Sequence, residues 1–546
     1  MLEGCTPFPA EVQERYVREG IWRRETIPQA IAKAALEHSD SIAVSDSTRS
    51  LTYSQLIAEA GSLATLLSRN GIEPNDRIIV QVPNCVEFAT LTIACLEIGA
   101  TPIMALPAFR KAELEYLVSF SDAKAIAIIP EYRGFDHAAL ARDLGTHLIV
   151  STSPAAGCVS MHGHGASSRS IGSSTSDPFD VALFLLSGGT TGLPKLIPRT
   201  HADYLYNGRE SAAATGLTSE SRIVLALPAE HNFPLACPGL LGALLTGARA
   251  VFTQSSKAAD LANTIERERI THLPCVPALA IALLDLPQSS HAGLASLRVI
   301  TVGGQRLQEP TARALKCAFP HLVVQQVLGM AEGLLCYSPL DAPEEVAFTT
   351  QGHPLSRVDE IRIVNTDGRD VATGEVGELW CRGPYTIRGY FRAPERNREA
   401  FTADGFYRTG DLVRLDPSGN LVVEGRIKDL INRGGEKINA EEIEAHLIAH
   451  PAVSAAAVVA MPDAVLGEKA CAYLSLHHGE TFAIAAMREF LAARGVAQFK
   501  WPERIEIVGE LPLTNVGKIK KAELRRDIVD KLAAERGSLA SRAIAP

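Results

Sequence analysis

The chain lacks the features that mark several broad classes of protein. Its ten cysteines include no Cys-x-x-Cys pair, so neither a zinc site nor a disulfide framework is expected, and reduced thiols in a cytoplasmic protein fit best. The N-terminus has neither the basic start nor the apolar stretch of a signal peptide. A net charge of -9 gives no electrostatic basis for binding nucleic acid or an anionic membrane, so neither is expected as a partner.

Long uninterrupted apolar runs are also absent. The most apolar region, residues 88–106, contains Glu97, Gly99 and Pro102, so it predicts a buried helix that runs into a strand rather than a membrane span. Residues 161–177 are rich in Gly, Ser and His without an apolar period, which predicts a loop. Two histidines in this loop, at positions 162 and 164, could indicate a metal site, but no cysteine or carboxylate lies beside them, which favours a solvated loop.

Alternating helical and strand-like segments predict an α/β protein of more than one domain. A chain of 546 residues with 46% hydrophobic content can bury a large core and is long enough to divide. Apolar spacing predicts helices at residues 53–70, 86–98, 440–450 and 482–494, and strands at residues 77–82, 181–186, 454–461 and 470–476. We therefore expect domains at residues 1–428 and 429–546, with a hinge at Lys428 and Asp429.

A glycine-rich segment after the strand at residues 181–186 is the first candidate binding site. It reads Ser187-Gly-Gly-Thr-Thr-Gly-Leu-Pro-Lys195, and its three glycines allow backbone amides to face an anion. A Walker-type loop would place Gly-Lys-Ser/Thr at a helix start, whereas Lys195 follows Pro194 and precedes a strand-like segment. Triphosphate binding by other machinery is therefore expected, with a glycine-rich surface turn as the alternative for the loop taken alone. The candidate phosphate contacts are Ser187, Gly188, Gly189, Thr190, Thr191, Gly192 and Lys195.

Further motifs follow along the chain in a fixed order. They are Gly303-Gly-Gln305, Gln326-Val-Leu-Gly-Met-Ala-Glu332, Tyr407-Arg-Thr-Gly-Asp411, Gly425-Arg-Ile-Lys-Asp429, Asn432-Arg-Gly-Gly-Glu-Lys437 and Asn515-Val-Gly-Lys518. In this order, and over nearly the whole chain, the sequence resembles the adenylate-forming ligases. The segments His231–Gly239 and Arg382–Tyr390 resemble the stand-alone aryl acid-AMP ligases of siderophore biosynthesis, and among these the salicyl-AMP ligases. The resemblance implies the adenylate-forming ligase fold, an α/β fold with a large multi-layered N-terminal domain and a small mobile α+β C-terminal domain.

The resemblance also implies an enzyme that uses ATP and Mg²⁺ to convert a carboxylate into an acyl-adenylate. A carboxylate is a poor electrophile, and transfer of AMP onto it creates a mixed anhydride with a good leaving group. In the family Glu332 helps to hold Mg²⁺, while Asp411 and Arg426 reach the ribose. The expected adenine contacts are Gly303, Gly304, Gln326, Val327 and Leu328. Taken singly, structural roles stay open: Asp411 as a turn residue, Glu332 as a helix cap, and Arg426 in a surface ion pair with Asp429.

Two tasks are implied for the small domain. In the family Lys518 contacts both the carboxylate and the α-phosphate and stabilises the transition state, although a solvated basic stretch is the alternative for this lysine. After the adenylate forms, the domain rotates about Asp429 and presents Lys437, so that a phosphopantetheine thiol can displace AMP. No Gly-x-Asp-Ser carrier signature follows this domain, so the expected acceptor is a separate phosphopantetheinylated aryl carrier protein.

The resemblance places the aryl acid pocket after His231. In the family Asn232 contacts the ortho hydroxyl, Phe233 supplies an aromatic wall, and His231 lies beside the carboxylate unless it is a core histidine. Cys237 and Leu335 stand where relatives that activate 2,3-dihydroxybenzoate have serine and valine. A 3-hydroxyl buried there would lose roughly 1 to 3 kcal/mol of hydrogen bonding, which favours salicylate over 2,3-dihydroxybenzoate unless Cys237 is only a small core residue. The candidate pocket residues are His231, Asn232, Phe233, Cys237, Gly304, Gly329 and Leu335.

Three rival functions can be weighed from the same residues. An oxidative relative of the luciferase type would also adenylate a carboxylate, but would give oxygen-dependent light or product instead of a thioester. A nonenzymatic ATP-binding regulator could lack Lys518 or Glu332, and both are present here. Another ligase that resembles the acyl-CoA synthetases is the least favoured alternative.

Overall fold

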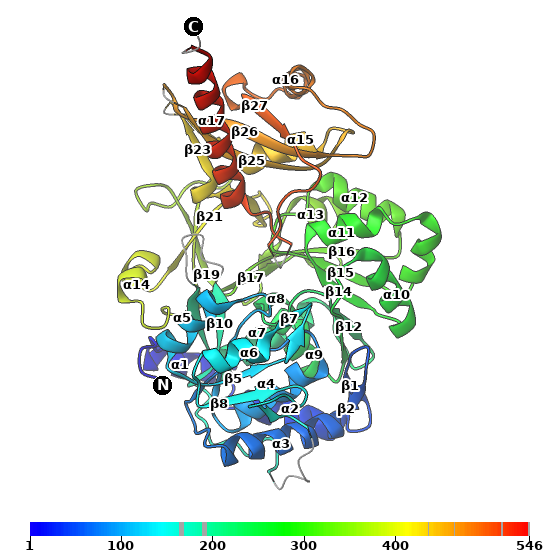
Figure 1. Cartoon of the computed structure of the whole chain (residues 1–546), viewed down its shortest axis with the longest axis vertical. Coiled ribbons are helices and arrows are strands. Elements are labelled where there is room, and N and C mark those ends of the chain that lie inside the picture. Colours follow the sequence, from blue (N-terminus) through cyan, green and yellow to red (C-terminus); the bar gives the residue numbers. More distant parts are fainter. Residues whose placement is uncertain (163–168, 188–193, 435, 464, 515–516, 544–546) are drawn as a thin grey trace. The chain divides into compact units, whose positions relative to one another are not determined.

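The chain folds as two compact units in a computed structural model that describes residues 1–162, 169–187, 194–434, 436–463, 465–514 and 517–543 (Figure 1). The first unit holds residues 1–307, 311–361 and 381–408. The second unit holds residues 308–310, 362–380 and 409–546. Residues 362–380 and 409–428 therefore belong to the second unit although they precede Asp429, and the predicted domain boundary at residues 428 and 429 stays a prediction.

The first unit contains a seven-stranded sheet, and its strand β10 ends at Ser187, the first residue of the glycine-rich segment. Its strand order is β11-β10-β4-β3-β5-β8-β9. The strands are β3 (Arg77–Gln81), β4 (Thr101–Met104), β5 (Ala123–Ile128), β8 (Leu148–Ser151), β9 (Val159–Ser160), β10 (Val181–Ser187) and β11 (Lys195–Thr200). All neighbours pair in parallel except β10 and β11, which form an antiparallel hairpin. The predicted strands at residues 77–82 and 181–186 are confirmed.

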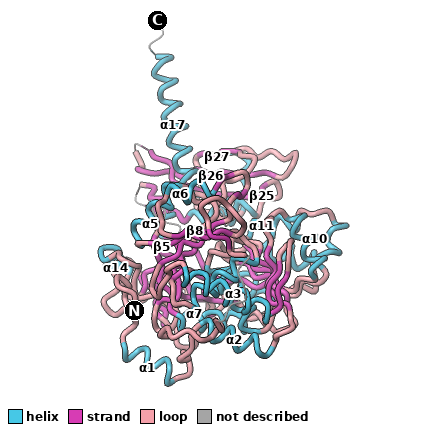
Figure 2. Tube along the Cα trace, turned by 60° about the horizontal axis from the view of Figure 1, so that its bottom comes forward, coloured by secondary structure: helices cyan, strands magenta, loops and turns pink. Residues whose placement is uncertain are grey.

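A second, nine-stranded sheet has the order β18-β17-β16-β15-β14-β12-β13-β1-β2. Its strands are β1 (Ile42–Ser45), β2 (Ser50–Thr52), β12 (Arg222–Leu225), β13 (Arg249–Phe252), β14 (His272–Cys275), β15 (Val299–Val302), β16 (Val323–Met330), β17 (Gly333–Tyr337) and β18 (His353–Pro354). Figure 2 shows helices α10 (Ala258–Glu268) and α11 (Pro277–Leu284) beside these strands. Leu273 and Ile300 of the sheet pack with Leu261 and Leu283 of these helices in one buried core. A separate short hairpin joins β6 (Glu131–Tyr132) and β7 (Phe135–Asp136).

Helices lie between the two sheets and make the unit multi-layered. Helix α4 (Val86–Glu97) contacts β4 of one sheet and β1 of the other, and nearly all of its residues are buried. It packs along α3 (Tyr53–Arg69), so both predicted helices are confirmed. The apolar region at residues 88–106 is therefore a core helix that leads into β4, as predicted. Among the described residues, no helix is long and apolar enough to cross a membrane.

Threonine caps mark several helix starts in the first unit. Thr26, Thr52 and Thr200 each form a capping box with the residue three positions later, which satisfies backbone amides that a helix end leaves without partners. The remaining helices are α1 (Ala10–Arg18), α2 (Ile27–Glu37), α5 (Lys111–Ser121), α6 (His137–Asp143), α7 (His201–Ala214), α8 (Asn232–Ala236), α9 (Gly239–Thr246), η1 (Gln288–Leu294), α12 (Glu309–Ala318), α13 (Glu344–Thr349) and α14 (Pro394–Ala400).

The second unit contains a five-stranded α+β domain and most of a four-stranded sheet. One sheet has the order β19-β20-β21-β22, and the other has the order β24-β23-β26-β25 with β27 paired to β26. The strands are β19 (Glu360–Val364), β20 (Gly377–Arg382), β21 (Tyr407–Leu415), β22 (Leu421–Arg426), β23 (Leu430–Arg433), β24 (Glu436–Asn439), β25 (Val453–Asp463), β26 (Gly467–Leu476) and β27 (Arg504–Ile507). The predicted strands at residues 454–461 and 470–476 are confirmed as β25 and β26.

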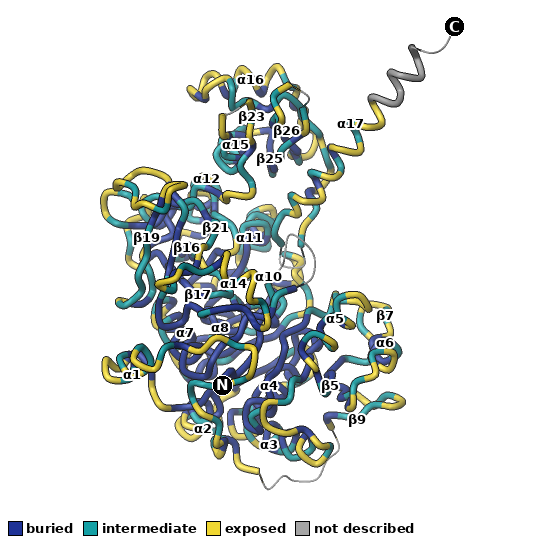
Figure 3. Tube along the Cα trace, turned by 90° about the vertical axis from the view of Figure 1, so that its left-hand side faces the viewer, coloured by how far each residue is buried: buried dark blue, intermediate teal, exposed yellow. Residues whose placement is uncertain are grey.

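Helices cover the five-stranded sheet of the second unit. The helical segments of this unit are η2 (Ile427–Asp429), α15 (Ala440–Ile448), α16 (Ile484–Ala493), η3 (Gln498–Lys500) and α17 (Lys521–Ala543). Ile443 of α15 and Leu491 of α16 pack with Val458 and Leu474 of the sheet. Figure 3 shows β25 and β26 as buried and much of α16 as exposed, which is the pattern of helices on the outside of a sheet. The predicted helices at residues 440–450 and 482–494 are confirmed.

Candidate active site

The strands on either side of the glycine-rich loop form the β10–β11 hairpin, in which Ser187 and Lys195 are opposite each other. Gly188, Gly189, Thr190, Thr191 and Gly192 lie outside the described residues, so their phosphate contacts stay predictions. Ser187 Oγ is buried and has no hydrogen-bond partner among the described residues, so it is available to an anion. Lys195 Nζ lies 4.4 Å from the centre of the Tyr390 ring, and burial lowers the pKa of Lys195.

Glu332 lies in the turn between β16 and β17 and not at a helix end, so the helix-cap interpretation is wrong. Tyr390 Oη donates a hydrogen bond of 2.9 Å to Glu332 Oε1, and the Ile387 amide donates one of 2.8 Å to the Glu332 carbonyl. The Lys195 ammonium faces the same Tyr390 ring, so a carboxylate and a cation converge on one aromatic side chain. Mg²⁺ prefers carboxylate oxygens together with substrate phosphates, and Glu332 fits the predicted magnesium role.

The segments predicted to hold adenine lie side by side. Gly303 and Gly304 follow strand β15, beside Gln326, Val327 and Leu328 of β16. A Cβ atom on Gly303 would lie 2.5 Å from Val327 Cγ1, so glycine is needed for this close approach. The Gln326 amide donates to two carbonyl groups of helix α13. The backbone amide of Gln326 donates to Ser338 Oγ at 2.9 Å, and its carbonyl accepts from the Ser338 amide at 3.1 Å, so the adenine contact of this residue stays a prediction.

Asp411 and Arg426 face each other across strands β21 and β22 of the second unit. Arg426 Nε lies 2.7 Å from Asp411 Oδ1, and the side chain of Asp411 is 6% exposed whereas that of Arg426 is 44% exposed. Asp411 lies within a strand, so its interpretation as a turn residue is wrong. Asp429 pairs with Arg525, so the suggested ion pair between Arg426 and Asp429 is also wrong.

Most of the predicted aryl pocket residues come from helix α8, the residues on either side of it and the β16–β17 hairpin, while Gly304 follows β15. His231 occupies the N-cap position of α8, and Asn232 begins this helix. Cys237, Leu335 and Phe233 pack in one apolar cluster, although more than 90 residues separate Leu335 from the other two. The fold therefore brings together the residues that the sequence assigns to one edge of the pocket.

A glycine at position 329 leaves room for Leu335 in this cluster. The two residues are opposite each other in β16 and β17, and a Cβ atom on Gly329 would lie 2.6 Å from Leu335 Cδ2. Cys237 is 1% exposed, and burial raises the pKa of its thiol to about 11, so the sulfur is protonated at neutral pH. This edge of the cluster therefore consists of an aliphatic side chain and a neutral thiol.

Lys518 lies in a tight loop of the second unit. The Thr514 amide donates a hydrogen bond of 2.7 Å to the Lys518 carbonyl, and the Lys518 amide donates one of 3.0 Å to Thr514 Oγ1. Gly517 has a φ of 74°, a value that favours glycine, and its amide also bonds to the Thr514 carbonyl. These bonds hold the backbone on both sides of Lys518, while residues 515 and 516 lie outside the described part of the chain.

The predicted hinge is tied to a helix of the same unit. Asp429 Oδ1 accepts a hydrogen bond from Arg525 of α17, and the Lys428 carbonyl accepts one of 3.4 Å from the same guanidinium. Lys437 is exposed in β24, opposite Asn432 of β23. One arginine therefore contacts two successive residues of the segment about which rotation is predicted.

Family models match most of the chain. The model of the AMP-binding enzyme matches residues 31–391, and that of the AMP-binding enzyme C-terminal domain matches residues 442–518. The chain belongs to the AMP-binding enzymes. A 2,3-dihydroxybenzoate-AMP ligase of Bacillus subtilis (strain 168) is 43% identical to it over 542 residues, which cover 98% of this chain and 99% of that ligase.

Two further comparisons agree with this family. A salicylyl-CoA synthase / salicylate adenylyltransferase of a Streptomyces species is 44% identical over 549 residues, which cover 96% of this chain and 98% of the relative. The apo structure of MbtA from Mycobacterium smegmatis has a TM-score of 0.73 and 42% sequence identity, and the match covers 96% of this chain and 98% of that one. The predicted resemblance, the adenylate-forming ligase fold and the expectation of an ATP-dependent ligase are confirmed.

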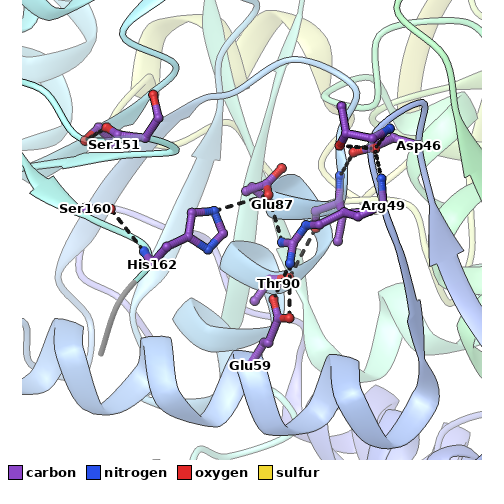
Figure 4. Close-up of polar contacts among 11 residues, drawn as sticks. Asp46, Arg49, Glu59, Glu87, Thr90, Ser151, Ser160 and His162 are labelled. Atoms are coloured by element: carbon purple, nitrogen blue, oxygen red, sulfur yellow. Dashed lines mark hydrogen bonds and ion pairs between the residues drawn. The ribbon is translucent and has the colours of Figure 1, made fainter. Parts of the chain in front are cut away.

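His162, in the predicted histidine-containing loop of this AMP-binding enzyme, is joined to a polar network. His162 Nε2 lies 3.3 Å from Glu87 Oε1, and its amide donates a hydrogen bond to Ser160 Oγ (Figure 4). Glu87 also pairs with Arg49 at 2.7 Å. Within the described ranges no group of three or more His, Cys, Asp or Glu residues could hold a metal ion, and His164 lies outside those ranges.

Some residues that support the site of this AMP-binding enzyme are not predicted from the sequence. Tyr390 ends the segment Arg382–Tyr390 that carries the family resemblance, but its contact with Glu332 depends on the fold. Asn207 of α7 donates to Cys237 Sγ, and Arg199 of β11 donates to Asn207 Oδ1. Asp203 and Asn207 are four residues apart in α7, and polar residues at this spacing usually indicate a solvated helix face.

Proposed function

We propose that this AMP-binding enzyme is a salicylate-AMP ligase of siderophore biosynthesis. It activates salicylate with ATP to salicyl-adenylate and pyrophosphate, and then transfers the acyl group to the phosphopantetheine thiol of a separate aryl carrier protein. Activation of 2,3-dihydroxybenzoate by the same route is the second candidate. Similarity along nearly the whole chain to ligases named for each of these acids supports both candidates.

The composition of the aryl pocket favours salicylate. Asn232 would contact the 2-hydroxyl group, which both acids carry. A 3-hydroxyl group would be buried against the neutral thiol of Cys237 and the aliphatic side chain of Leu335, at a loss of about 1 to 3 kcal/mol. The packing of Cys237 and Leu335 in one cluster is the observation that carries this choice.

The first half-reaction joins two anions, so charge neutralisation matters more than covalent catalysis. A carboxylate oxygen of the aryl acid attacks the α-phosphorus, and the bond to pyrophosphate breaks as the new O–P bond forms. Lys518 would contact the carboxylate and the α-phosphate together and stabilise the pentacovalent transition state. His231 would lie beside the carboxylate, at the start of the helix that carries Asn232.

The nucleotide is held by groups of several types. Ser187 and Lys195, with the intervening loop residues, would donate to the terminal phosphates, and Glu332 would hold Mg²⁺. When bound, Mg²⁺ supplies charge neutralisation at the phosphates. Asp411 accepts hydrogen bonds from the ribose hydroxyls, with Arg426 beside it. Each of these groups acts by position and charge, and no covalent enzyme intermediate is needed.

The second half-reaction uses a different face of the small domain. Residues 429–546 would rotate about Asp429, which withdraws Lys518 and presents Lys437. The phosphopantetheine thiolate then attacks the acyl carbon, and AMP leaves as the thioester forms. The same protein would therefore catalyse both steps without a second active site.

Pyrophosphate exchange into ATP tests the proposal with four acids: salicylate, 2,3-dihydroxybenzoate, benzoate and a fatty acid. We expect the largest kcat/KM with salicylate, less with 2,3-dihydroxybenzoate and benzoate, and no exchange with the fatty acid. A preference for 2,3-dihydroxybenzoate would select the second candidate. Absence of exchange with every aryl acid would overturn adenylation itself and favour a nonenzymatic ATP-binding role.

A further inference from the structure

A buried arginine behind the aryl pocket is the centre of a polar network in the first unit. The Arg199 side chain is fully buried at the end of β11, and its Nε donates to Asp203 Oδ1 of α7 at 2.8 Å. The other carboxylate oxygen of Asp203 accepts from the Thr200 amide and hydroxyl. A guanidinium can only donate hydrogen bonds, so every group that it contacts must present an acceptor.

This guanidinium orients the side-chain amide of Asn207, one helical turn beyond Asp203. Arg199 Nη2 donates to Asn207 Oδ1 at 3.4 Å, so this oxygen faces the arginine. Asn207 Nδ2 must then face the opposite way, where it donates to the Ala236 carbonyl at 2.7 Å and to Cys237 Sγ at 3.4 Å. Because the sulfur accepts this hydrogen bond, the thiol hydrogen has to point away from Asn207.

The same guanidinium also supports the tyrosine that holds Asn232. Arg199 Cζ lies 4.6 Å from the centre of the Tyr204 ring, and Tyr204 Oη donates a hydrogen bond of 3.0 Å to Asn232 Oδ1. The Asn232 amide nitrogen donates to the Met330 carbonyl at 3.4 Å. With its oxygen already accepting from Tyr204, Asn232 offers its second N–H to other partners.

The network also contacts the turn between β16 and β17, which carries Glu332, the predicted magnesium residue. Arg199 Nη1 donates a hydrogen bond of 3.1 Å to the carbonyl of Ala331, the residue before Glu332. One buried side chain therefore contacts the residue before Glu332 and, through Asn207 and Tyr204, is linked to two residues of the aryl pocket, Cys237 and Asn232. A charge buried in this way is costly unless all its contacts are kept, so these positions are coupled.

We propose that Arg199 is a positioning residue for the aryl pocket. By orienting Asn207, it directs the Cys237 S–H toward the bound acid as a hydrogen-bond donor. By supporting Tyr204, it directs an N–H of Asn232 toward the acid in the same way. The inference rests on the proposed function and deepens it. It assigns Asn207 to discrimination at the 3-position of the ring and Tyr204 to discrimination at the 2-position. The N–H of Asn232 would donate to the 2-hydroxyl oxygen that both acids carry, whereas the S–H of Cys237 is a weak donor that only partly offsets the burial of a 3-hydroxyl, so salicylate stays the preferred acid.

Two substitutions separate the two positions. Asn207→Leu frees the thiol, so the kcat/KM ratio of salicylate to 2,3-dihydroxybenzoate should rise about threefold or more, while the ratio of salicylate to benzoate changes little. Tyr204→Phe frees the Asn232 amide, so the kcat/KM ratio of salicylate to benzoate should fall about threefold or more. The kcat/KM ratio of salicylate to 2,3-dihydroxybenzoate should change little. Both ratios come from pyrophosphate exchange at saturating ATP.

Matched controls remove buried groups that lie elsewhere in the same unit. Gln81→Leu deletes a buried amide that bonds to the Leu106 and Phe109 carbonyls, and Tyr53→Phe deletes a buried hydroxyl that bonds to the Ala243 and Ala248 carbonyls. Both controls should leave the two ratios at their wild-type values. Equal changes in the controls would mean that loss of packing explains the effect, and the inference would be wrong.

A double substitution tests whether Asn207 acts through sulfur. In a Cys237→Ala background, Asn207→Leu should no longer change the salicylate to 2,3-dihydroxybenzoate ratio. A change that persists in this background would overturn the assignment.

Infrared spectroscopy of the wild-type enzyme gives a measurement that needs no folded Asn207 variant. The S–H stretching band of Cys237, identified by its loss in Cys237→Ala, should move to lower frequency when bound 2,3-dihydroxybenzoate replaces salicylate. An unchanged band would contradict an S–H donor facing the ring. If the proposed function itself is wrong, the wild-type enzyme will show no pyrophosphate exchange with either acid, and this result is distinct from an unchanged S–H band.

Discussion

Asp411 and Arg426, the two residues predicted to reach the ATP ribose, form an ion pair with each other, with Arg426 Nε 2.7 Å from Asp411 Oδ1. They are opposite each other in antiparallel strands, so the backbone fixes their separation. The carboxylate is almost fully buried, and the guanidinium is half-exposed. A ribose would therefore meet an acceptor whose orientation is already set, which lowers the entropy lost on binding.

The first prediction follows from this pair. Asp411→Ala should raise the KM for ATP about tenfold or more, because a hydrogen bond to a charged group contributes roughly 1.5 to 3 kcal/mol. The KM for the aryl acid should change little. Arg414→Ala is the matched control, since Arg414 pairs with Glu424 at 2.7 Å in the same hairpin. If Arg414→Ala raises the KM for ATP equally, the effect comes from the hairpin and not from the ribose contact.

The second prediction concerns Lys518, the predicted catalytic lysine. Lys518→Ala should abolish adenylation measured by pyrophosphate exchange, because no other cation would join the carboxylate and α-phosphate. Thioester formation from supplied salicyl-adenylate should be largely retained, since the proposed mechanism assigns that step to the other face of the small domain. Lys520→Ala, which removes an exposed lysine paired with Glu523, should leave both steps intact. Equal losses in both half-reactions of Lys518→Ala would contradict this division of tasks.

The third prediction tests the hinge. Asp429→Pro fixes a backbone φ angle, so acyl transfer to the carrier protein should fall more than pyrophosphate exchange. Asp429→Ala removes the ion pair with Arg525 but leaves the backbone free, and should therefore retain more acyl transfer than the proline variant. Acyl transfer at the wild-type rate in Asp429→Pro would show that rotation about this residue is not required.

The fourth prediction addresses substrate choice. Cys237→Ser with Leu335→Val introduces a stronger donor and more space, so relative kcat/KM should move toward 2,3-dihydroxybenzoate by about fivefold or more. The two side chains pack in one cluster, so their effects need not add, and each single variant is measured beside the double. An unchanged preference in the folded double variant would remove the physical support for salicylate.

The fifth prediction uses a buried carboxyl group outside the catalytic proposal. Glu230 is 2% exposed, and neither of its carboxyl oxygens has a hydrogen-bond partner among the described residues. Burial raises its pKa from 4.5 to about 8. Because the folded-state pKa lies above the unfolded value, the native state binds more protons between these pH values, and stability falls as pH rises through this range.

Glu230→Gln should therefore stabilise the enzyme increasingly from pH 5 to pH 8, by up to about 1.4 kcal/mol per pH unit relative to wild type. Calorimetric Tm values of both proteins across this range measure the difference. Glu220→Gln, at an exposed glutamate of the same unit, should show no such slope. A Tm difference that does not change with pH would mean that Glu230 does not titrate in this window.

Local patterns account for the elements that could be predicted. The helices α3 and α15 and the strands β3 and β26 lie within a few residues of their predicted bounds, because apolar periods and capping residues act over short sequence distances. The ordered motifs from the glycine-rich loop to Lys518 also identify the ligase family without any tertiary information. Residue identity at successive positions was sufficient for both.

Only the tertiary structure decided which polar groups contact each other. Arg426 pairs with Asp411 and not with the nearby Asp429, because antiparallel pairing of β21 and β22 places the first two side chains opposite each other. Glu332 meets Tyr390, and Arg199 meets the carbonyl of Ala331, across long stretches of chain. No periodicity encodes such pairs, since they depend on where the fold brings distant strands and turns together. The sequence by itself determined the family and the chemistry it performs, whereas the packing of α7 against α8 and the β16–β17 turn decided how the pocket residues are held.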